Sequence, residues 1–290
     1  MNNFIILTIG YKCNNNCINC MLANCLDKLD PISYNEYEHI LVKTKQDAIY
    51  DSLILSGGEV TLTPDLVKFI SYAKKLNYFK HIRIQTNGRL LADFDYCKSI
   101  VEAGVDEFFV SVYGATPAKH EALTKAMHSF DQTIGGLRNI CSLGAKIITN
   151  TVVTSINYQD LENIVDLVYK TAQVHEVFFT NYLPMSTYDS LDLLVKNEEV
   201  KPFLFSAIEL ASKFNIKVFL DGFPKCYFKH AYCQSYPRAQ IFIDDKFWSE
   251  YQNNYFRCIY KETCKDESCL QLPLAYINKY GWDRAILKSE

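Results

Sequence analysis

Residues 4–20 read FIILTIGYKCNNNCINC, in which an apolar run leads directly into Cys13, Cys17 and Cys20 with the spacing CxxxCxxC. The apolar run has the composition of a buried β-strand. Three thiolates on one short loop can bind three irons of a cubane iron-sulfur cluster and leave the fourth iron open to another ligand. A structural zinc site is the competing interpretation, because Cys25 follows closely enough to supply a fourth thiolate. The spacing favours a cluster, since zinc sites usually pair their cysteines as CxxC.

The alternation of apolar runs and helical segments continues from this stretch to about Leu220. Leu161–Ala172 is the clearest of the segments with helical periodicity. Strands that alternate with helices form right-handed crossovers and a parallel sheet, so we predict an α/β fold with functional residues at the C-terminal ends of the strands. The predicted strands are Phe4–Ile9, Ser52–Leu55, His81–Gln85, Glu107–Val112, Lys146–Val153, Glu176–Asn181 and Ile216–Leu220.

The chain changes character near Asp221. From Gly222 to Trp282 the alternation stops, and this stretch holds five of the eleven cysteines. A short irregular segment cannot build a large core and is commonly held together by metal. We therefore predict an α/β domain over 1–220 and a small Cys-rich region over 221–290. The five cysteines of this region are Cys226, Cys233, Cys258, Cys264 and Cys269.

The composition limits the classes of protein that fit. The chain has 290 residues, 49% of them hydrophobic, enough for one large domain or a domain with an appendage. The many cysteines, with no basic head or cleavage site of a signal peptide before them, are typical of a reducing compartment, and we expect a cytoplasmic location. No apolar run approaches the length of a membrane span, so we expect no membrane partner. The net charge of −3 argues against nucleic acid as a partner.

Polar or glycine-rich motifs stand at the ends of the predicted strands. Two adjacent glycines allow a ligand to approach the backbone closely, and a glutamate can accept hydrogen bonds from an ammonium group. Each motif alone is consistent with an ordinary turn. Because the ends of parallel strands meet at one edge of the sheet, the motifs together predict a ligand-binding edge. They are Ser56-Gly57-Gly58-Glu59, Thr86-Asn87-Gly88, Ser111-Val112-Tyr113-Gly114 and, within the fifth strand, Asn150-Thr151.

In this combination the motifs resemble the radical S-adenosylmethionine (SAM) superfamily over about Phe4 to Pro184. The resemblance implies a partial (β/α)6 TIM-type barrel with a small irregular Cys-rich C-terminal extension. It also implies that Cys13, Cys17 and Cys20 hold a [4Fe-4S] cluster whose fourth iron is chelated by SAM. In this family one electron from the cluster cleaves SAM to a 5′-deoxyadenosyl radical, which abstracts hydrogen from a substrate.

The resemblance also assigns residues to SAM. Gly57, Gly58 and Glu59 would contact the methionyl ammonium group. The rest of SAM would be contacted by Asn87, Ser111 and Asn150. Asn19 departs from the family pattern, because the position before the last cysteine is usually an aromatic residue that packs near the adenine.

The C-terminal cysteines resemble the auxiliary-cluster tails, of SPASM and twitch type, in radical enzymes that modify peptides. This resemblance implies an auxiliary [4Fe-4S] cluster on Cys226, Cys258, Cys264 and Cys269. Cys233 is left over, and three roles remain open for it. It could replace one of the four ligands, donate a hydrogen atom to a substrate radical, or be an inert thiol.

The same resemblance implies a ribosomally synthesised peptide as substrate, with cross-linking, thioether formation or epimerisation as the reaction. A reducing partner such as flavodoxin or ferredoxin would supply electrons. Because Cys13 lies so near the first residue of the chain, we expect either a separate protein or another surface to bind the leader of the peptide. Two alternatives remain: the same chemistry on a small metabolite or a tRNA base, and a non-catalytic zinc protein, which would leave the strand-end motifs unexplained.

Overall fold

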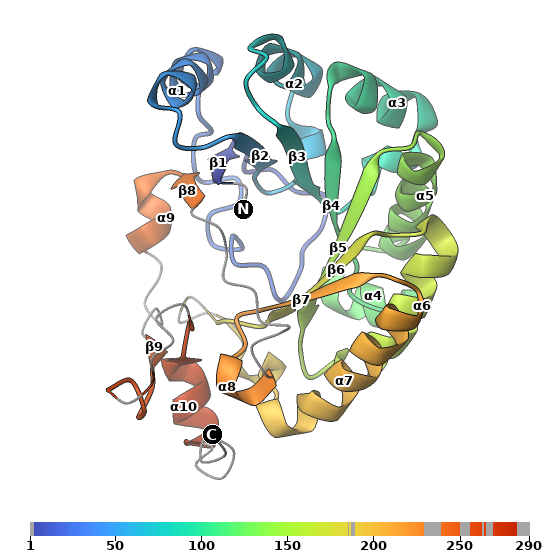
Figure 1. Cartoon of the computed structure of the whole chain (residues 1–290), viewed down its shortest axis with the longest axis vertical. Helices are drawn as coiled ribbons and strands as arrows, with labels where there is room; N and C mark the ends of the chain where they lie inside the picture. Colours follow the sequence, from blue (N-terminus) through green and yellow to red (C-terminus); the bar gives the residue numbers. More distant parts are fainter. Residues whose placement is uncertain are drawn as a thin grey trace.

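The computed structural model describes residues 3–184, 186, 189–228, 239–249, 256–262, 264 and 269–282. Its main feature is an eight-stranded sheet formed by β1 (Phe4–Thr8), β2 (Ser52–Ser56), β3 (His81–Thr86), β4 (Glu107–Ser111), β5 (Lys146–Val153), β6 (Glu176–Asn181), β7 (Lys217–Asp221) and β8 (Ala239–Phe242). The order is β7-β6-β5-β4-β3-β2-β1-β8, and every neighbouring pair is parallel. The sheet curls into part of a barrel, which confirms the predicted fold class (Figure 1).

Most of the helices cover the outer, convex side of the curled sheet, whereas the short helices after residue 224 lie at its open side (Figure 1). Local signals define their ends: at the start of the first helix, the Ser33 hydroxyl accepts a hydrogen bond from Glu36 N–H, and the Glu36 carboxylate accepts one from Ser33 N–H. No helix among the described residues is both long and apolar enough to cross a membrane. The helices are α1 (Tyr34–Asp47), α2 (Leu66–Lys75), α3 (Phe94–Ala103), α4 (Pro117–Thr124), α5 (Ser129–Ser142), α6 (Leu161–Ala172), α7 (Asn197–Lys213), α8 (Lys225–Phe228), α9 (Asp245–Ser249) and α10 (Leu274–Tyr280).

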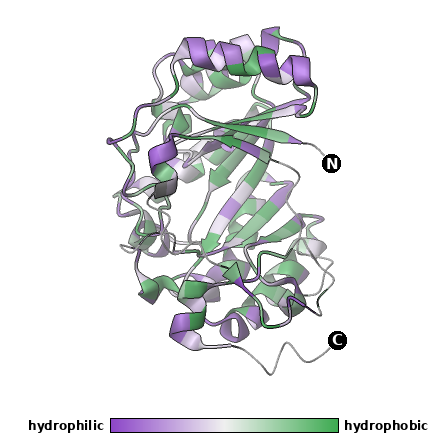
Figure 2. Cartoon of the chain, turned by 90° about the vertical axis from the view of Figure 1, so that its left-hand side faces the viewer, coloured by the Kyte–Doolittle hydropathy of each residue, from purple (hydrophilic) through white to green (hydrophobic). Residues whose placement is uncertain are grey.

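The main core lies between the sheet and these outer helices. Alternate strand residues, such as Leu53, Ile82 and Val110, are fully buried in one apolar cluster with Leu137 of α5 and Val165 of α6. Each such side chain stabilises the fold by about 1.5–3 kcal/mol relative to an exposed position. Figure 2 shows apolar colour along the strands and hydrophilic colour on the outward sides of the helices. The intervening strand residues therefore face the concave side of the sheet, because side chains alternate along a strand.

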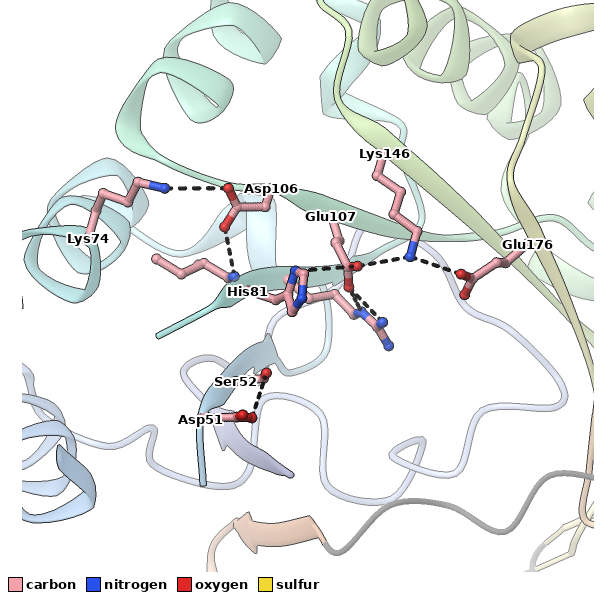
Figure 3. A network of polar contacts seen from close by, with 10 residues as sticks. Asp51, Ser52, Lys74, His81, Asp106, Glu107, Lys146 and Glu176 are labelled. Atoms are coloured by element: carbon pink, nitrogen blue, oxygen red, sulfur yellow. Dashed lines mark hydrogen bonds and ion pairs between the residues drawn. The ribbon is translucent and has the colours of Figure 1, made fainter. Parts of the chain in front are cut away.

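At the N-terminal ends of the strands, an ion network occupies the concave side (Figure 3). Glu107 is 3% exposed and binds Arg83 Nη2 at 2.6 Å and Lys146 Nζ at 3.0 Å. Lys146 also pairs with Glu176 at 2.9 Å. Burial alone would raise the pKa of Glu107, but Arg83 and Lys146 together hold it below its ordinary value. Balanced charges thus occupy this end of the barrel, and the opposite end carries the strand-end motifs.

The C-terminal region contributes more regular structure than its sequence predicts. β8 joins the main sheet beside β1, with Phe4 opposite Ala239. Two further short strands, β9 (Phe256–Arg257) and β10 (Leu272–Pro273), pair antiparallel. The sequence does not signal β8, because its four residues show no apolar alternation and three of them are exposed. The predicted boundary at 220/221 stays a prediction.

Candidate active site at the C-terminal edge of the sheet

The cysteine loop follows β1 and is fastened on one side by the motif after β2. Gly58 N–H donates to the Gly10 carbonyl at 2.9 Å, and Glu59 N–H donates to the Lys12 carbonyl at 2.7 Å. A Cβ atom on Gly57 would lie 2.3 Å from the Gly10 oxygen, and one on Gly58 would lie 2.5 Å from the Lys12 oxygen. Both glycines are therefore required for this close approach to the cysteine loop. Their contact with the methionyl group stays a prediction.

The opposite side of the loop rests on the C-terminal end of α4. Asn16 N–H donates to the Thr124 carbonyl at 2.9 Å, and Ile18 N–H donates to the Leu123 carbonyl at 3.0 Å. These carbonyls belong to the last turn of a helix, where they have no partner within the helix. The loop backbone is thereby fixed between two elements before any ligand contributes.

Two side chains from the end of β3 hold the middle of the loop. Asn87 Nδ2 donates to Asn14 Oδ1 at 2.6 Å. Arg89 donates to the Asn14 carbonyl and, at 2.8 Å, to Asn15 Oδ1. The Arg89 Nε also donates to Gln132 Oε1 of α5 at 2.6 Å. Sequence reasoning identified Asn87 but missed Arg89, whose only sequence signal is its place directly after the Thr86-Asn87-Gly88 motif.

Glu59 connects the motifs that follow β2 and β3. Its carboxylate is 2% exposed; Oε2 accepts from Asn87 N–H at 2.6 Å, and Oε1 accepts from the hydroxyls of Thr61 and Thr86 at 2.6 Å and 2.5 Å. Burial raises the pKa of Glu59, and these hydrogen bonds partly offset that rise. The buried carboxylate thus connects the segments that follow β2 and β3 at the edge of the sheet.

The three loop cysteines are free thiols that lie within electrostatic range of one another. Burial raises the pKa of all three, and the neighbouring Cys20 and Cys13 raise the pKa of Cys17 further. Asn15 N–H donates to Cys13 Sγ at 3.4 Å, and the positive charge of Arg89 lowers the pKa of Cys13. Hydrogen bonds and positive charge of this kind stabilise a thiolate that binds metal. The residues therefore fit the three protein ligands of a cluster.

The position of Cys25 and the spacing of the other cysteines can be compared with what a structural zinc site would need. Cys25 is 3% exposed and packs in an apolar cluster with Tyr11 and Phe247. Within the described ranges, no three or more His, Cys, Asp or Glu side chains are assembled around one metal-ion position. A cubane cluster does not require that, because each thiolate binds a different iron.

Further along the edge, the concave side carries neutral polar groups. Ser111 of β4 and Asn150 of β5 are opposite each other in the ladder. Thr180 Oγ1 donates to Asn150 Oδ1 at 2.7 Å. One layer deeper lie three rings, with the centroids of Phe109 and Phe178 5.3 Å apart and those of Phe178 and Phe219 4.7 Å apart. The structure thus brings the predicted Ser111 and Asn150 together above an aromatic layer that the sequence analysis did not single out.

In the tail, Cys226 lies within electrostatic range of Cys258, Cys264 and Cys269. The pKa of Cys226 is raised to about 12, first by desolvation and then by the charges of Cys269, Cys258 and Cys264. Backbone N–H groups of Tyr260 and Gln271 donate to the sulfurs of Cys258 and Cys269, each at 3.4 Å. Both bonds have the same i+2 spacing as the bond from Asn15 to Cys13. Cys233 lies outside the described residues.

Comparison with known proteins adds three findings. The model of the radical SAM superfamily matches residues 7–168. A GTP 3′,8-cyclase from Alkaliphilus oremlandii is 27% identical over 203 residues, which cover 68% of this chain and 62% of that protein. The crystal structure of Streptococcus suis SuiB bound to S-adenosylmethionine superposes with a TM-score of 0.68 at 18% identity, covering 82% of this chain and 57% of SuiB.

A second SuiB structure, bound to the precursor peptide SuiA, superposes with a TM-score of 0.66 at 16% identity and covers 98% of this chain and 65% of SuiB. The chain thus spans about three fifths of the length of the relatives it matches.

Proposed function

Since the chain belongs to the radical SAM superfamily, we propose that it uses this chemistry to modify a ribosomally synthesised peptide. The bound cluster and SAM would supply a 5′-deoxyadenosyl radical that abstracts hydrogen. Cys13, Cys17 and Cys20 would hold the cluster, and the fastened loop would fix their positions. Gly57, Gly58 and Glu59 would border the methionyl group, and Asn87, Ser111 and Asn150 would border the remainder of SAM.

One observation carries the choice of a peptide: the distribution of charge on the concave side of the sheet. A nucleoside triphosphate is normally bound by several lysine or arginine side chains. In the C-terminal halves of β1 to β8, the described residues facing this side include no lysine or arginine. Arg83 and Lys146 are committed to the acidic groups at the other end. Lys225, which follows β7, is buried and already interacts within the chain.

Neutral polar groups over an aromatic layer suit a peptide better than they suit a nucleoside triphosphate. Amide and hydroxyl groups such as Asn150 and Thr180 can hydrogen-bond a peptide backbone, and the rings of Phe178 and Phe219 can pack against its side chains. This choice is supported by the SuiB structure, in which a chain of similar fold is bound to a precursor peptide. A reducing protein such as flavodoxin or ferredoxin and a separate leader-binding protein complete the proposal.

The proposed function also includes a role for the cysteines of the C-terminal region. We propose that Cys226, Cys258, Cys264 and Cys269 hold an auxiliary [4Fe-4S] cluster, because the last three lie within electrostatic range of Cys226 and two of the four already accept backbone hydrogen bonds. Cys17→Ala should then abolish SAM cleavage, whereas Cys264→Ala should retain part of it and impair product formation. Cys141→Ala, which changes a thiol of α5 far from both groups in the sequence, is the matched control. Equal loss of both activities in the first two variants would contradict separate roles.

The second candidate is a small-metabolite substrate, favoured by the relative named GTP 3′,8-cyclase. One experiment separates the two. Anaerobically reconstituted protein is incubated with SAM and a reductant, and either with short peptides encoded beside its gene or with GTP. The proposal predicts 5′-deoxyadenosine together with a peptide that has lost two hydrogens, or one that has gained deuterium from heavy water. Consumption of GTP with unaltered peptides would contradict it.

A further inference from the structure

The last helix of the described residues, α10, is fastened to the segment that joins β6 to α7. Lys279 Nζ donates to the Leu191 carbonyl at 2.6 Å, and the Tyr280 hydroxyl donates to the Leu194 carbonyl at 2.7 Å. The hydroxyl of Tyr276, which is buried, accepts a hydrogen bond at 3.0 Å from the backbone N–H of the first residue of α7. Three polar side chains of one short helix therefore hold a segment that is distant in the sequence.

The same segment relies on a second anchor, at the end of β5. The carbonyl of Asp192 accepts from the Ser155 hydroxyl at 2.8 Å, and the carbonyl of Leu193 accepts from Ser155 N–H at 2.9 Å. With the two bonds from α10, four successive carbonyls of residues 191–194 accept hydrogen bonds from other elements. Because backbone carbonyls need partners and a short irregular segment supplies few of its own, these donors fix its conformation.

From this position the segment contacts the cysteine loop at two points. Asn24 Nδ2, shortly after the third loop cysteine, donates to Ser186 Oγ at 3.1 Å. Ile18, between the second and third cysteines, packs against an apolar cluster that combines Leu193 of the segment with Ala275 of α10. The cysteine loop is therefore connected to α10 both by a chain of hydrogen bonds and by shared apolar packing.

We propose that Tyr276, Lys279 and Tyr280 are positioning residues for SAM. Through the segment between β6 and α7, they hold the cysteine loop in the conformation that binds the cofactor. A loop that is ordered before its ligand arrives pays less conformational entropy on binding, so the docked α10 should strengthen SAM binding. By thermodynamic linkage, bound SAM must then favour the docked form of α10. The inference rests on the SAM chemistry of the family, and not on the choice of substrate or on an auxiliary cluster.

The first test removes only the polar contacts of α10. In a variant with Tyr276→Phe, Lys279→Met and Tyr280→Phe, the rings and the aliphatic stem remain while the three hydrogen bonds are lost. The cluster-loaded variant should bind SAM roughly 5-fold or more weakly than the wild type, as expected for coupling between distant groups. The matched control, Tyr72→Phe with Lys75→Met on the outer helix α2, should bind SAM as the wild type does.

Iron content verifies that each protein holds its cluster, and Tyr280→Phe alone replaces the triple change if the latter retains less iron. Thermal unfolding separates positioning from stability. If α10 acted only on stability, the variant would unfold at a lower temperature and still bind SAM as tightly as the wild type. That result would overturn the proposal.

Hydrogen exchange on the cluster-loaded wild type measures the reciprocal effect and needs no variant. SAM should slow the exchange of backbone amides in α10 and in residues 191–194, and it should leave the amides of α2 unchanged. Exchange in α10 that is the same with and without bound SAM would overturn the proposal. A reconstituted protein that binds no SAM would contradict both the family chemistry and this inference.

Discussion

At the scale of single residues, Arg89 is the side chain that joins most parts of the site. It contacts Asn14 and Asn15 of the cysteine loop and Gln132 of α5, and its charge partly offsets the burial that raises the pKa of Cys13. These partners lie 75, 74 and 43 residues away in the sequence. One guanidinium therefore fixes the loop to the barrel and favours the thiolate form of a cluster ligand.

Arg89→Ala should loosen the cysteine loop. Loss of the hydrogen bonds to Asn14 and Asn15 is expected to lower the free energy of unfolding by about 1–3 kcal/mol, because their acceptors remain partly buried. It should also reduce the iron retained after reconstitution. Chemical denaturation and iron analysis measure the two effects. Arg138→Ala, at an exposed position on α5, is the control. The same iron content in both variants would contradict a role for Arg89 at the cluster.

The same contacts show why sequence reasoning found only part of the site. Cys13, Cys17 and Cys20 share one short motif, and Asn87 belongs to a recognisable strand end. Arg89 acts through partners that only the folded sheet brings near. The contact of Glu59 with an ammonium group stays a prediction, and what the sequence did not reveal is that its carboxylate also accepts hydrogen bonds from Thr61, Thr86 and Asn87.

At the scale of elements, the seven strands from β1 to β7 lie within one residue of their predicted ends. They were predictable because long apolar runs alternate with amphipathic helices. The supporting role of α4 was not predictable, because it depends on two carbonyls at its last turn meeting the backbone of Asn16 and Ile18. β8 was missed because pairing with β1, rather than apolar composition, makes it a strand.

α4 also carries a buried histidine that makes stability depend on pH. His120 is 1% exposed, and its Nδ1 accepts from Tyr113 N–H at 3.3 Å. Burial, and secondarily the charge of Arg89, lowers its pKa from 6.5 to about 4. Since the unfolded chain protonates this histidine below pH 6.5 and the folded chain does not until about pH 4, stability falls as the pH drops through that window.

The loss should reach about 3 kcal/mol at most, from the size of the pKa shift. Denaturant unfolding of apo protein at about pH 7.5 and pH 5 measures it. His120→Gln should remove most of the difference between the two pH values. His39→Gln, which changes a histidine on the outer helix α1, should not. If the His120 variant keeps the whole pH dependence, other groups cause it.

At the scale of the whole molecule, the ion pairs that stabilise the barrel and the residues of the candidate active site lie at opposite ends of the sheet. Ion pairs around Glu107 occupy one end of the concave side, an aromatic layer follows, and the cysteine loop lies at the other end. Because of this division, the ion pairs around Glu107 lie at the N-terminal ends of the strands and not at the C-terminal edge, where the cysteine loop lies. The division also explains how a chain with an ordinary hydrophobic core can present a largely neutral surface to a substrate.

Glu107→Gln should destabilise the protein strongly. The change leaves Arg83 and Lys146 partly buried without their shared carboxylate, which costs about 3–5 kcal/mol for a buried ion pair. Glu102→Gln removes an exposed i,i+4 partner of Lys98 and should cost less than about 0.5 kcal/mol. Thermal unfolding compares the two variants. SAM binding below the unfolding temperature should be unchanged in both, and a loss confined to Glu107→Gln would contradict the separation of the two ends.

The most direct test of the account is the iron content per chain, measured with EPR on three anaerobically reconstituted proteins. The wild type should hold roughly 8 irons, and replacement of Cys13, Cys17 and Cys20 by alanine should leave roughly 4 and remove the EPR change caused by SAM. Replacement of Cys226, Cys258, Cys264 and Cys269 should also leave roughly 4 irons but keep the response to SAM. Wild-type protein that holds zinc in place of iron, or an N-terminal variant that still responds to SAM, would contradict it.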